Sequence, residues 1–364
     1  MPAPVLREWV IRPSDPEVCR TLADALGLKD LTAAVLTARG HRTPEAARAF
    51  LDGAESPAHD PFLLTGMEQA VDRLHRAVRG RERVLVYGDY DVDGASATSL
   101  YLGFFKGLGL AADFYIPNRI KEGYGLNADA VRRIAASGVS VLITADCGTT
   151  SVDEIALAQS LGMDVIVTDH HVPEKTLPPA LAILNPCKSD SGYPFTGLCS
   201  GGLAYKVASA YHAKYGSRES DQDRALDLVA LATIADVAPI QDENRALVRK
   251  GLALLSRGVR PGIRALKAAA GVEGACGVGT VGFTLAPRLN AAGRLGEAAD
   301  AVRLLVTEDD REAAELAGLL TRLNQERQRV EEGIVAEAIR AAEAAPSGPL
   351  VLASRGWHQG VVGI

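Results

Sequence analysis

Residues 84–108 read VLVYGDYDVDGASATSLYLGFFKGL, an apolar run that passes through a polar loop into a helical pattern. Val84 to Tyr87 predict a short buried strand, and Ala95 to Leu108 predict a helix. Further helical segments are expected at 127–137 and 151–161. Other apolar runs predict strands at 112–117, 139–146, 164–169 and 181–185. This alternation predicts an α/β fold, with a parallel sheet covered by helices on both faces.

Length and composition limit the class of protein. A chain of 364 residues, at roughly 150 residues per domain, suggests two domains or one large domain with appendages. Hydrophobic residues make up 47% and charged residues 23%, which excludes wholesale disorder. No run approaches the roughly 20 apolar residues that span a bilayer, so we expect a cytoplasmic protein with no membrane partner. The five cysteines form no CxxC pair, which fits reduced thiols and argues against structural zinc.

Composition shifts divide the chain into five expected parts. Residues 1–62 predict an N-terminal helical extension, and 63–256 predict the catalytic α/β domain. The glycine-rich segment 257–306 is expected to complete that domain and to contact phosphate or DNA. Residues 307–346 predict a long charged helix, interpreted as a connector, although a helix packed on its own domain fits equally well. A strand that opens within 347–364 predicts the truncated start of a further domain.

Three acids, Asp89, Asp91 and Asp93, occupy alternate positions directly after the first strand. Carboxylates this close repel one another, and the repulsion grows where water is partly excluded, so a cation is expected among them. The alternative is a solvated acidic turn, since Asp and Gly are ordinary loop residues. The net charge of −6 opposes nucleic-acid binding through bulk charge, but bound divalent cations would reverse that effect locally.

Other acids and imidazoles follow neighbouring strands. Asp146 ends the run VLIT, and Asp169, His170 and His171 end the next apolar run. Each could be a helix cap or incidental, but together they place ligands of one kind at one sheet edge. Oxygen-rich donors with one imidazole suit Mn²⁺ or Mg²⁺, as one ion or two. Asp236 lies in the apolar helical run ALDLVALATIADVAPI and either joins this cluster or forms a salt bridge at a helix end.

Several motifs resemble a known family. VYGDYDVDG (86–94), ADCGTT (145–150) and the Asp-His-His triplet resemble the DHH phosphoesterase superfamily. Other segments are similar to the RecJ single-strand-specific exonucleases: NRIKEGYGLN (118–127), NPCKSDSGYPFTGLCSGGLAYK (185–206), TIADVAPI (233–240) and PRLNAAGRLG (287–296). GWHQGVVGI (356–364) resembles the start of the DHH-associated domain. The resemblance covers about residues 65–364 and implies a DHH phosphoesterase domain.

The resemblance implies a role for each acid. Asp91 and Asp93 match acids that hold one metal each, with Asp89 beside them as a further family acid, and Asp146 matches the carboxylate that bridges two metals. Related enzymes often have His where this chain has Tyr87, so the first metal site is expected to lack a nitrogen ligand.

The resemblance also assigns the remaining site residues. His170 and Asp236 match ligands of the second metal, and His171 matches the histidine near the scissile phosphate. Two cations about 3.5 to 4 Å apart stabilise the attacking and leaving oxygens of a phosphodiester, and water bound to them loses its proton readily. His171 is a candidate proton donor to the phosphate or the leaving oxygen.

Candidate substrate contacts fall in three segments. Arg288, Asn290 and Arg294 offer two forked cations and an amide suited to phosphate, with an ordinary surface loop as the alternative. A second group, between two predicted elements, combines basic and aromatic groups as a single-strand groove would, although its tyrosine fits a core position equally: Arg119, Lys121 and Tyr124. The third group precedes a helix whose N-terminus could take an anion: Ser200, Gly201 and Gly202.

The leading hypothesis is a metal-dependent exonuclease that releases 5′-mononucleotides from the 5′ end of single-stranded DNA in repair and recombination. By resemblance its partners are a helicase and a single-strand-binding protein. One alternative is a DHH phosphodiesterase for short oligonucleotides or cyclic dinucleotides, and another is an inactive DNA-binding scaffold; the intact acids argue against the latter. Gly277, Gly279 and Gly282 spell GxGxxG, but no strand precedes them and Pro287 is expected to break any helix, so a nicotinamide cofactor is not expected.

Overall fold

The computed structural model describes residues 10–11, 13–52, 58–216, 223–343 and 348–364. Two compact units, Met1–Pro57 and Ala58–Ile364, divide the chain. In the first unit, helices pack around a small core of Leu22, Ala33, Leu36 and Ala47, which confirms a helical extension. These helices are α1 (Pro16–Leu26), α2 (Asp30–Ala38) and α3 (Pro44–Asp52), of which α1 was not predicted from the sequence. Part of the expected extension, 1–9 and 53–57, lies outside the described residues.

The second unit contains a five-stranded parallel sheet in the order β2-β1-β3-β4-β5. Its strands are β1 (Val84–Gly88), β2 (Ala112–Tyr115), β3 (Val141–Ala145), β4 (Asp164–Thr168) and β5 (Ala182–Leu184). The predicted parallel sheet is thereby confirmed. In this doubly wound order β2 is added on one side of β1, and β3, β4 and β5 are added on the other side. The strand order therefore reverses between β1 and β3, and ligands bind at the carboxyl ends of the strands at such a switch point.

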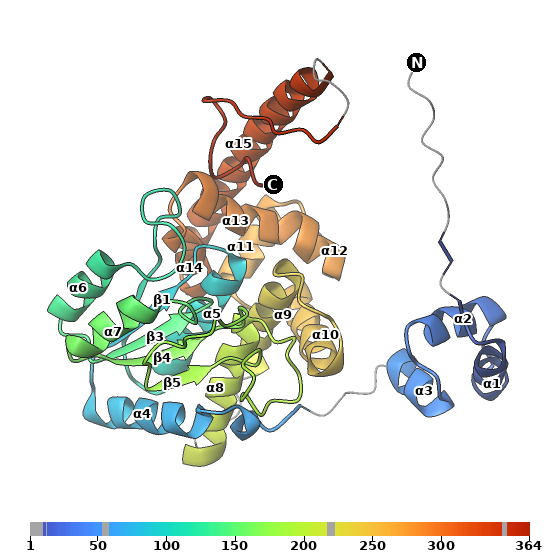
Figure 1. Cartoon of the computed structure of the whole chain (residues 1–364), viewed down its shortest axis with the longest axis horizontal. Coiled ribbons are helices and arrows are strands. Elements are labelled where there is room, and N and C mark those ends of the chain that lie inside the picture. Colours follow the sequence, from blue (N-terminus) through green and yellow to red (C-terminus); the bar gives the residue numbers. More distant parts are fainter. Residues whose placement is uncertain (1–9, 12, 53–57, 217–222, 344–347) are drawn as a thin grey trace. The chain divides into compact units, whose positions relative to one another are not determined.

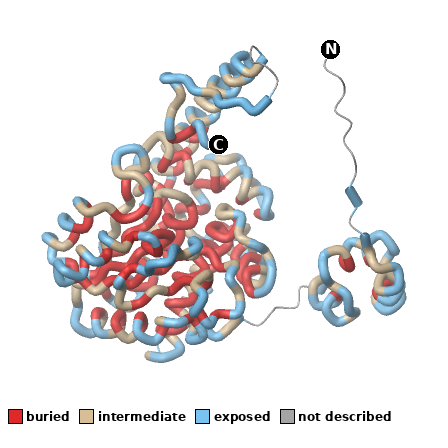
Figure 2. The backbone as a smooth tube through the Cα atoms, in the orientation of Figure 1, coloured by how far each residue is buried: buried red, intermediate tan, exposed pale blue. Residues whose placement is uncertain are grey.

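Helices cover both faces of the sheet (Figure 1). Val84 and Val86 of β1 join one core cluster, whereas Leu85 and Tyr87 join the other, as the period of two along a strand requires. The first face is covered by α4 (Met67–Gly80), α5 (Val92–Gly107) and α8 (Ser200–Tyr215). The second is covered by α6 (Ala128–Ala136) and α7 (Val152–Ser160). In Figure 2 the buried residues gather in the middle of this unit, and every residue of β1 and β3 is among the buried ones.

The rest of the unit is helical. The helices are α9 (Leu226–Ala235), α10 (Asp242–Arg257), α11 (Pro261–Ala269), α12 (Val278–Thr280), the π-helix η4 (Val281–Leu285), α13 (Ala286–Leu295), α14 (Ala299–Val306) and α15 (Asp310–Glu343), with short 3₁₀ turns η1 (Pro61–Leu63) and η3 (Asp223–Ala225) elsewhere. The expectation that Pro287 breaks a helix is wrong. Pro287 closely follows the π-helical turn η4 at the start of α13, and the helical segment 278–295 continues through it. Between β5 and Gly277 the described residues contain helices and no strand. The GxGxxG motif therefore lacks the preceding strand that a dinucleotide-binding turn requires.

The long helix α15 confirms the predicted charged helix, and its buried residues Ala313, Ala317 and Leu320 pack its first half against α11, α13 and α14. Its expected end, at 344–347, lies outside the described residues. The segment 348–364 contains no strand and returns along α15, where Trp357 donates to Glu337. Among the described residues no helix has both the length and the apolar character needed to cross a membrane.

Gly251 in α10 permits the close packing of α10 against α9. A Cβ at this position would overlap the carbonyl oxygen of Leu226 and lie 2.5 Å from Cβ of Ala230. We expect Gly251→Ala to lower the free energy of unfolding by about 1–3 kcal/mol through overpacking. The matched control is Gly103→Ala in α5, where nothing lies within 4 Å and alanine should stabilise by about 0.5–1 kcal/mol. Urea unfolding of both variants tests this, and equal effects would contradict it.

Candidate metal centre

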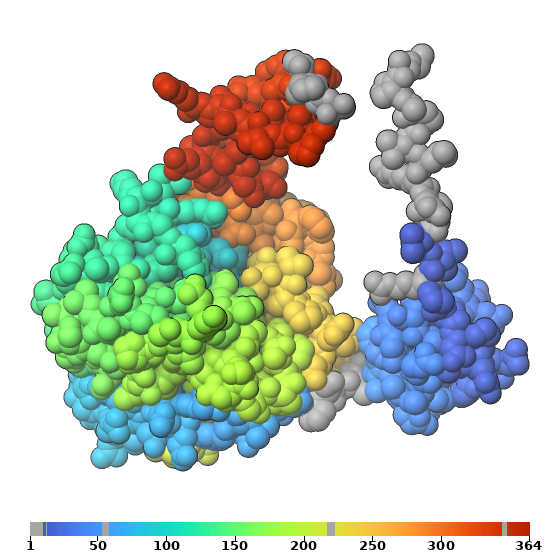
Figure 3. All heavy atoms as spheres, viewed as in Figure 1, coloured from blue at the N-terminus to red at the C-terminus, as the bar shows by residue number. Residues whose placement is uncertain are grey.

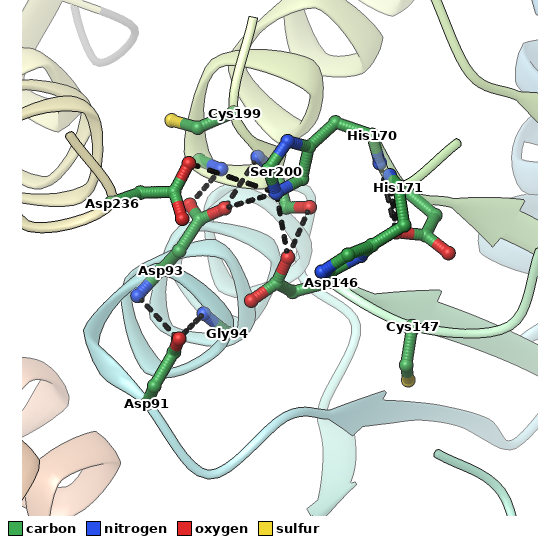
Figure 4. A network of polar contacts seen from close by, with 12 residues as sticks. Asp91, Asp93, Gly94, Asp146, Cys147, His170, His171, Cys199, Ser200 and Asp236 are labelled. Atoms are coloured by element: carbon green, nitrogen blue, oxygen red, sulfur yellow. Dashed lines mark hydrogen bonds and ion pairs between the residues drawn. The ribbon is translucent and has the colours of Figure 1, made fainter. Parts of the chain in front are cut away.

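The predicted acids converge at the carboxyl ends of β1 and β3, on the two sides of the switch point. The backbone N–H of Asp89 donates to Ala145, and that of Asp146 donates to Thr168, so the ladder continues one residue past each strand. Asp89 is 3% exposed, Asp93 1% and Asp146 2%. Figure 4 shows Asp93, Asp146, His170 and Asp236 pointing toward one another. The sheet topology therefore gathers carboxylates that are far apart in the sequence.

Asp91 begins α5 as its N-cap. Its Oδ1 accepts from the backbone N–H groups of Asp93, at 2.9 Å, and Gly94, at 3.1 Å, so its second oxygen is left for another partner. Gly94 is required here, because a Cβ would lie 2.6 Å from the carbonyl oxygen of Asp89. The motif GDYDVDG thus combines a cap, a close approach and three acids in one turn.

The N-terminus of α8 binds an anion, but the anion belongs to the protein. The N–H groups of Ser200 and Gly201 donate to the two oxygens of Asp93 at 2.7 and 2.8 Å. The expectation that Ser200 and Gly201 bind the substrate is therefore wrong for these amides, since Asp93 already occupies them. Gly201 also allows α8 to pack closely against α9, because a Cβ would lie 2.5 Å from Cβ of Ala232. The partial positive charge of the helix terminus steadies Asp93.

Asp146 has a left-handed backbone, with φ of 70°. This conformation is uncommon outside glycine and is tolerated best by Asn and Asp. It accompanies a carboxylate whose Oδ1 accepts from the Ser200 hydroxyl at 3.1 Å and lies 3.1 Å from Nε2 of His170. Strain of this kind is retained where the surrounding structure fixes a functional side chain.

His170 lies among three carboxylates. Its Nε2 is 3.1 Å from Asp146, 3.6 Å from Asp93 and 3.7 Å from Asp236. The sequence suggested that Asp236 lies inside a helix. In the structure it is the C-cap residue of α9. A helix C-terminus is an unfavourable place for a carboxylate, because the macrodipole there is negative. Its position in the cluster explains why the chain keeps an acid there.

His171 is held by a different acid. Its Nδ1 lies 2.7 Å from Asp169 and 3.1 Å from the hydroxyl of Tyr124, which also donates to the carbonyl of Asp146. The hydrogen bond with Asp169 raises the pKa of His171, and the same contact lowers the pKa of Asp169 although burial alone would raise it. The contacts with Asp169 and Tyr124 both involve Nδ1, so Nε2 of His171 is available to donate a hydrogen bond to a substrate in the cavity. The orienting role of Asp169 was not predicted, although its position before two histidines was noted.

The carboxylates strongly disfavour one another's charge. Burial, followed by the charge of Asp91, raises the pKa of Asp89 to about 8, and burial with the charge of Asp93 raises that of Asp236 to about 6. Burial and the neighbouring acids also raise the pKa values of Asp93 and Asp146. At about 5 Å and an effective dielectric constant of 20, each carboxylate pair repels by roughly 3–4 kcal/mol. A cation relieves this repulsion.

The donor atoms have the composition and spacing of a cation site. Three groups each offer ligand atoms within 4.8 Å of one another: Asp89, Asp91 and Asp146; Asp93, His170 and Asp236; Asp146, His170 and His171. Oδ1 of Asp89 is buried without a hydrogen-bond partner, which is costly unless something else binds it. Carboxylate oxygens with one or two imidazoles fit hard divalent ions such as Mn²⁺ or Mg²⁺. The residues present therefore fit the expected metal.

Tyr87, which stands where related enzymes often have His, turns away from this cluster. It packs in the core on the second face of the sheet, and its hydroxyl donates to the carbonyl of Gly125 and accepts from Asn127. Tyr87 therefore supplies no metal ligand, and the group of Asp89, Asp91 and Asp146 contains carboxylates alone.

A polar cavity of about 260 Å³ opens above the acids. It is lined by Asp89, Tyr90, Asp91, Arg119, Tyr124, Asp146, His171, Asp236, Asn290 and Arg294. Of the expected substrate contacts, Arg119, Tyr124, Asn290 and Arg294 are thus brought together. Lys121 and Arg288 are not among the lining residues.

Two cavity residues have contacts that the sequence did not indicate. Tyr90 was not predicted, yet the guanidinium of Arg119 lies 4.8 Å from its ring centre. Asn290 uses its Oδ1 to accept from the N–H of Val92 at 3.1 Å, which ties α13 to the first turn of α5. The only sequence signal for Tyr90 was its place between the acids.

The chain is similar to known exonucleases in both sequence and structure. The DHH family, N-terminal domain, matches residues 83–233. The single-stranded-DNA-specific exonuclease RecJ of Bacillus subtilis is 43% identical over 359 residues, which are 98% of this chain and 45% of that protein. The structure of Thermus thermophilus RecJ in complex with Mn²⁺ has a TM-score of 0.81 and 33% identity, covering 96% of this chain and 50% of that one. A manganese-bound exonuclease RecJ has a TM-score of 0.76 and 37% identity, covering 84% and 77%.

The doubly wound sheet thus has the fold of the DHH proteins. Within them, the chain belongs to the RecJ exonuclease family. It spans about half the length of the curated relatives it matches.

Replacing Asp146 by Asn tests the cation site through stability. Asn tolerates the left-handed backbone and keeps an acceptor for Ser200, but it removes a buried carboxylate. In EDTA we expect Asp146→Asn to melt at least about 2 °C above the wild type, because the repulsion is relieved. Added Mn²⁺ should raise the melting temperature of the wild type but not of the variant. An equal shift in both would rule out Asp146 as a ligand.

The raised pKa values predict how Mn²⁺ affinity depends on pH. A carboxyl group whose folded pKa is raised stabilises the metal-free chain below about pH 4, and this contribution is lost as the pH rises through the folded pKa. Metal binding needs the deprotonated form. With the pKa of Asp89 at about 8 and that of Asp236 at about 6, Mn²⁺ should bind about ten-fold or more tightly at pH 8 than at pH 6.

Calorimetric titrations at the two pH values measure this change. Asp89→Asn should flatten the profile, because it removes the group with the pKa of about 8. Equal affinities of the wild type at both pH values would disagree with proton release from these acids.

Proposed function

We propose that this chain carries the catalytic site of a metal-dependent exonuclease that removes 5′-mononucleotides from the 5′ end of single-stranded DNA. The observation that carries the proposal is one cavity that is lined both by candidate cation ligands, among them Asp89, Asp91 and Asp146, and by two arginines, Arg119 and Arg294. Its similarity to RecJ exonucleases supports the same conclusion. We expect Mn²⁺ or Mg²⁺ as the cofactor.

The cavity separates two kinds of phosphate contact. Divalent ions bound by the acids would lower the pKa of bound water and neutralise charge on the phosphodiester oxygens. Arg119 and Arg294 offer guanidinium donors to phosphate, although Nη1 of Arg294 also donates to the carbonyl of Gly360. Burial lowers the pKa of Arg294. Arg119 is also held over the ring of Tyr90, which restricts the guanidinium to the cavity wall. The cavity, with a volume of about 260 Å³, suits a single nucleotide phosphate with part of the sugar and is too small for a duplex.

His171 would donate a proton or a hydrogen bond to the substrate. Asp169 holds its Nδ1 and favours the imidazolium, so Nε2 can donate to a phosphate oxygen or to the leaving oxygen. The Tyr124 hydroxyl also lies 3.1 Å from the same nitrogen, which further restricts the ring. The arrangement resembles other triads in which a carboxylate fixes the tautomer of a catalytic histidine.

The wider assignments are also proposals. Residues 63–306 would form the catalytic domain, 307–346 the connector, and 347–364 the start of the DHH-associated domain. The protein would work in DNA repair and recombination with a helicase and a single-strand-binding protein. Arg288 and Lys121 would contact the strand outside the cavity.

A chain-length comparison tests the function. With Mn²⁺, the chain should release mononucleotides from a 5′-phosphorylated single strand of about 20 nucleotides, and much more slowly from the same sequence in a blunt duplex. Asp146→Asn should abolish release, because the variant lacks the carboxylate shared by two donor groups.

Labels at the 5′ and 3′ ends distinguish the outcomes. Early loss of the 5′ nucleotide supports the proposal, whereas early loss of the 3′ nucleotide contradicts the polarity. Cleavage of a dinucleotide but not of the long strand would favour the short-oligonucleotide phosphodiesterase. Binding without cleavage would favour a scaffold.

A further inference from the structure

We propose that Val237 and Phe283 form an apolar platform beside the metal centre, on which bases of single-stranded DNA pack. This inference rests on the proposed function and adds a surface for the bases, since the cavity itself holds groups for phosphate. Two exposed apolar side chains from separate segments carry it.

Val237 directly follows the cavity residue Asp236. It is 87% exposed and has a left-handed backbone, with φ of 57°. Glycine is the usual residue where a helix ends in this conformation, and a β-branched residue there is strained. Neither burial nor backbone geometry explains why a valine occupies this position. A ligand that covers the exposed apolar side chain would explain it.

Phe283 lies in the π-helix η4 and is 89% exposed. Burial of an aromatic side chain of this size would stabilise the fold, and the exposed position of Phe283 gives up that stabilisation. Single π-helical turns occur often at functional sites, because the inserted residue redirects neighbouring side chains. In η4 the flanking Val281 and Leu285 are buried, so Phe283 is the large apolar side chain that the turn directs outward.

The two residues lie on adjoining elements. η4 packs against α9, and a Cβ on Gly282 would lie 3.8 Å from Ile234, one turn before Val237. In Figure 3 the orange surface of α12 and α13 adjoins the yellow surface of the region around α10. Arg288, one turn beyond η4 in α13, bonds Thr284 through Nη1, and its other terminal nitrogen has no described partner.

The chemistry of the platform fits a single strand. Base stacking on aromatic side chains tolerates any sequence and is worth several-fold in affinity per base, and nearby cations follow the phosphates. The bases of a duplex are paired and stacked, so they are not free to pack on Phe283. The platform therefore favours unpaired strands.

A thermodynamic cycle tests the proposal. Oligo(dT) of about 12 nucleotides with a 5′-phosphate and a 3′-fluorophore is titrated by anisotropy in the cleavage-blocked Asp146→Asn background. Phe283→Ala should weaken binding about five-fold or more. Single abasic sites are then placed along the strand. At one position the abasic site should weaken binding to the Phe283 chain by a similar factor, with no further loss in Phe283→Ala.

Two further variants guard against misfolding and unspecific effects. Val237→Gly should keep or raise the melting temperature, since glycine suits the left-handed backbone, while weakening oligo(dT) binding. The matched control is Val259→Ala, an exposed valine before α11 and outside the cavity lining, which should leave affinity unchanged.

Unchanged affinity in Phe283→Ala, or abasic losses that add in full to the loss in that variant, would overturn the platform. The same holds if the parent chain does not bind oligo(dT). The proposed function fails separately, if the wild type with Mn²⁺ releases no mononucleotides while the binding cycle still shows stacking.

Discussion

Mutual repulsion among buried carboxylates is the constraint on which the rest of this structure depends. The sheet brings the ends of β1 and β3 together, and the residues after them are acids in both cases. The chain offsets part of this repulsion internally, through the cap at Asp91, the α8 amides on Asp93 and the imidazole of His170. Asp89 receives no such partner for Oδ1. The arrangement is complete only with positive charge supplied from outside.

Most of the fold followed from the sequence because its strands carry a strong local pattern. Four of the strands, β1, β3, β4 and β5, are largely apolar and buried runs that are followed at once by a polar residue, and such strands need little other signal. The segment around Pro287 was misjudged because its glycines and proline are typical of loops, whereas tertiary packing keeps 278–295 helical. The first helix, α1, was missed because its apolar positions serve only a small local core.

The candidate metal ligands could be predicted as a group because most of them directly follow strands whose carboxyl ends meet at one edge of the sheet. Roles that depend on the path of a neighbouring helix were not. Ser200 and Gly201 begin a helix, as expected, but only the fold shows that Asp93 reaches their amides. Likewise Asn290 accepts from the first N–H of α5, and the ring of Tyr90 lies under Arg119, through contacts between segments distant in the chain. No local pattern records such contacts.

The account is tested most directly by anomalous diffraction from a crystal of this chain soaked in Mn²⁺. It predicts one or two manganese peaks within coordination distance of Asp146, with Asp89 or Asp91 on one side and Asp93, His170 or Asp236 on the other. Peaks confined to surface acids, or an occupied crystal in which the Asp146 carboxylate points away from every ion, would contradict it.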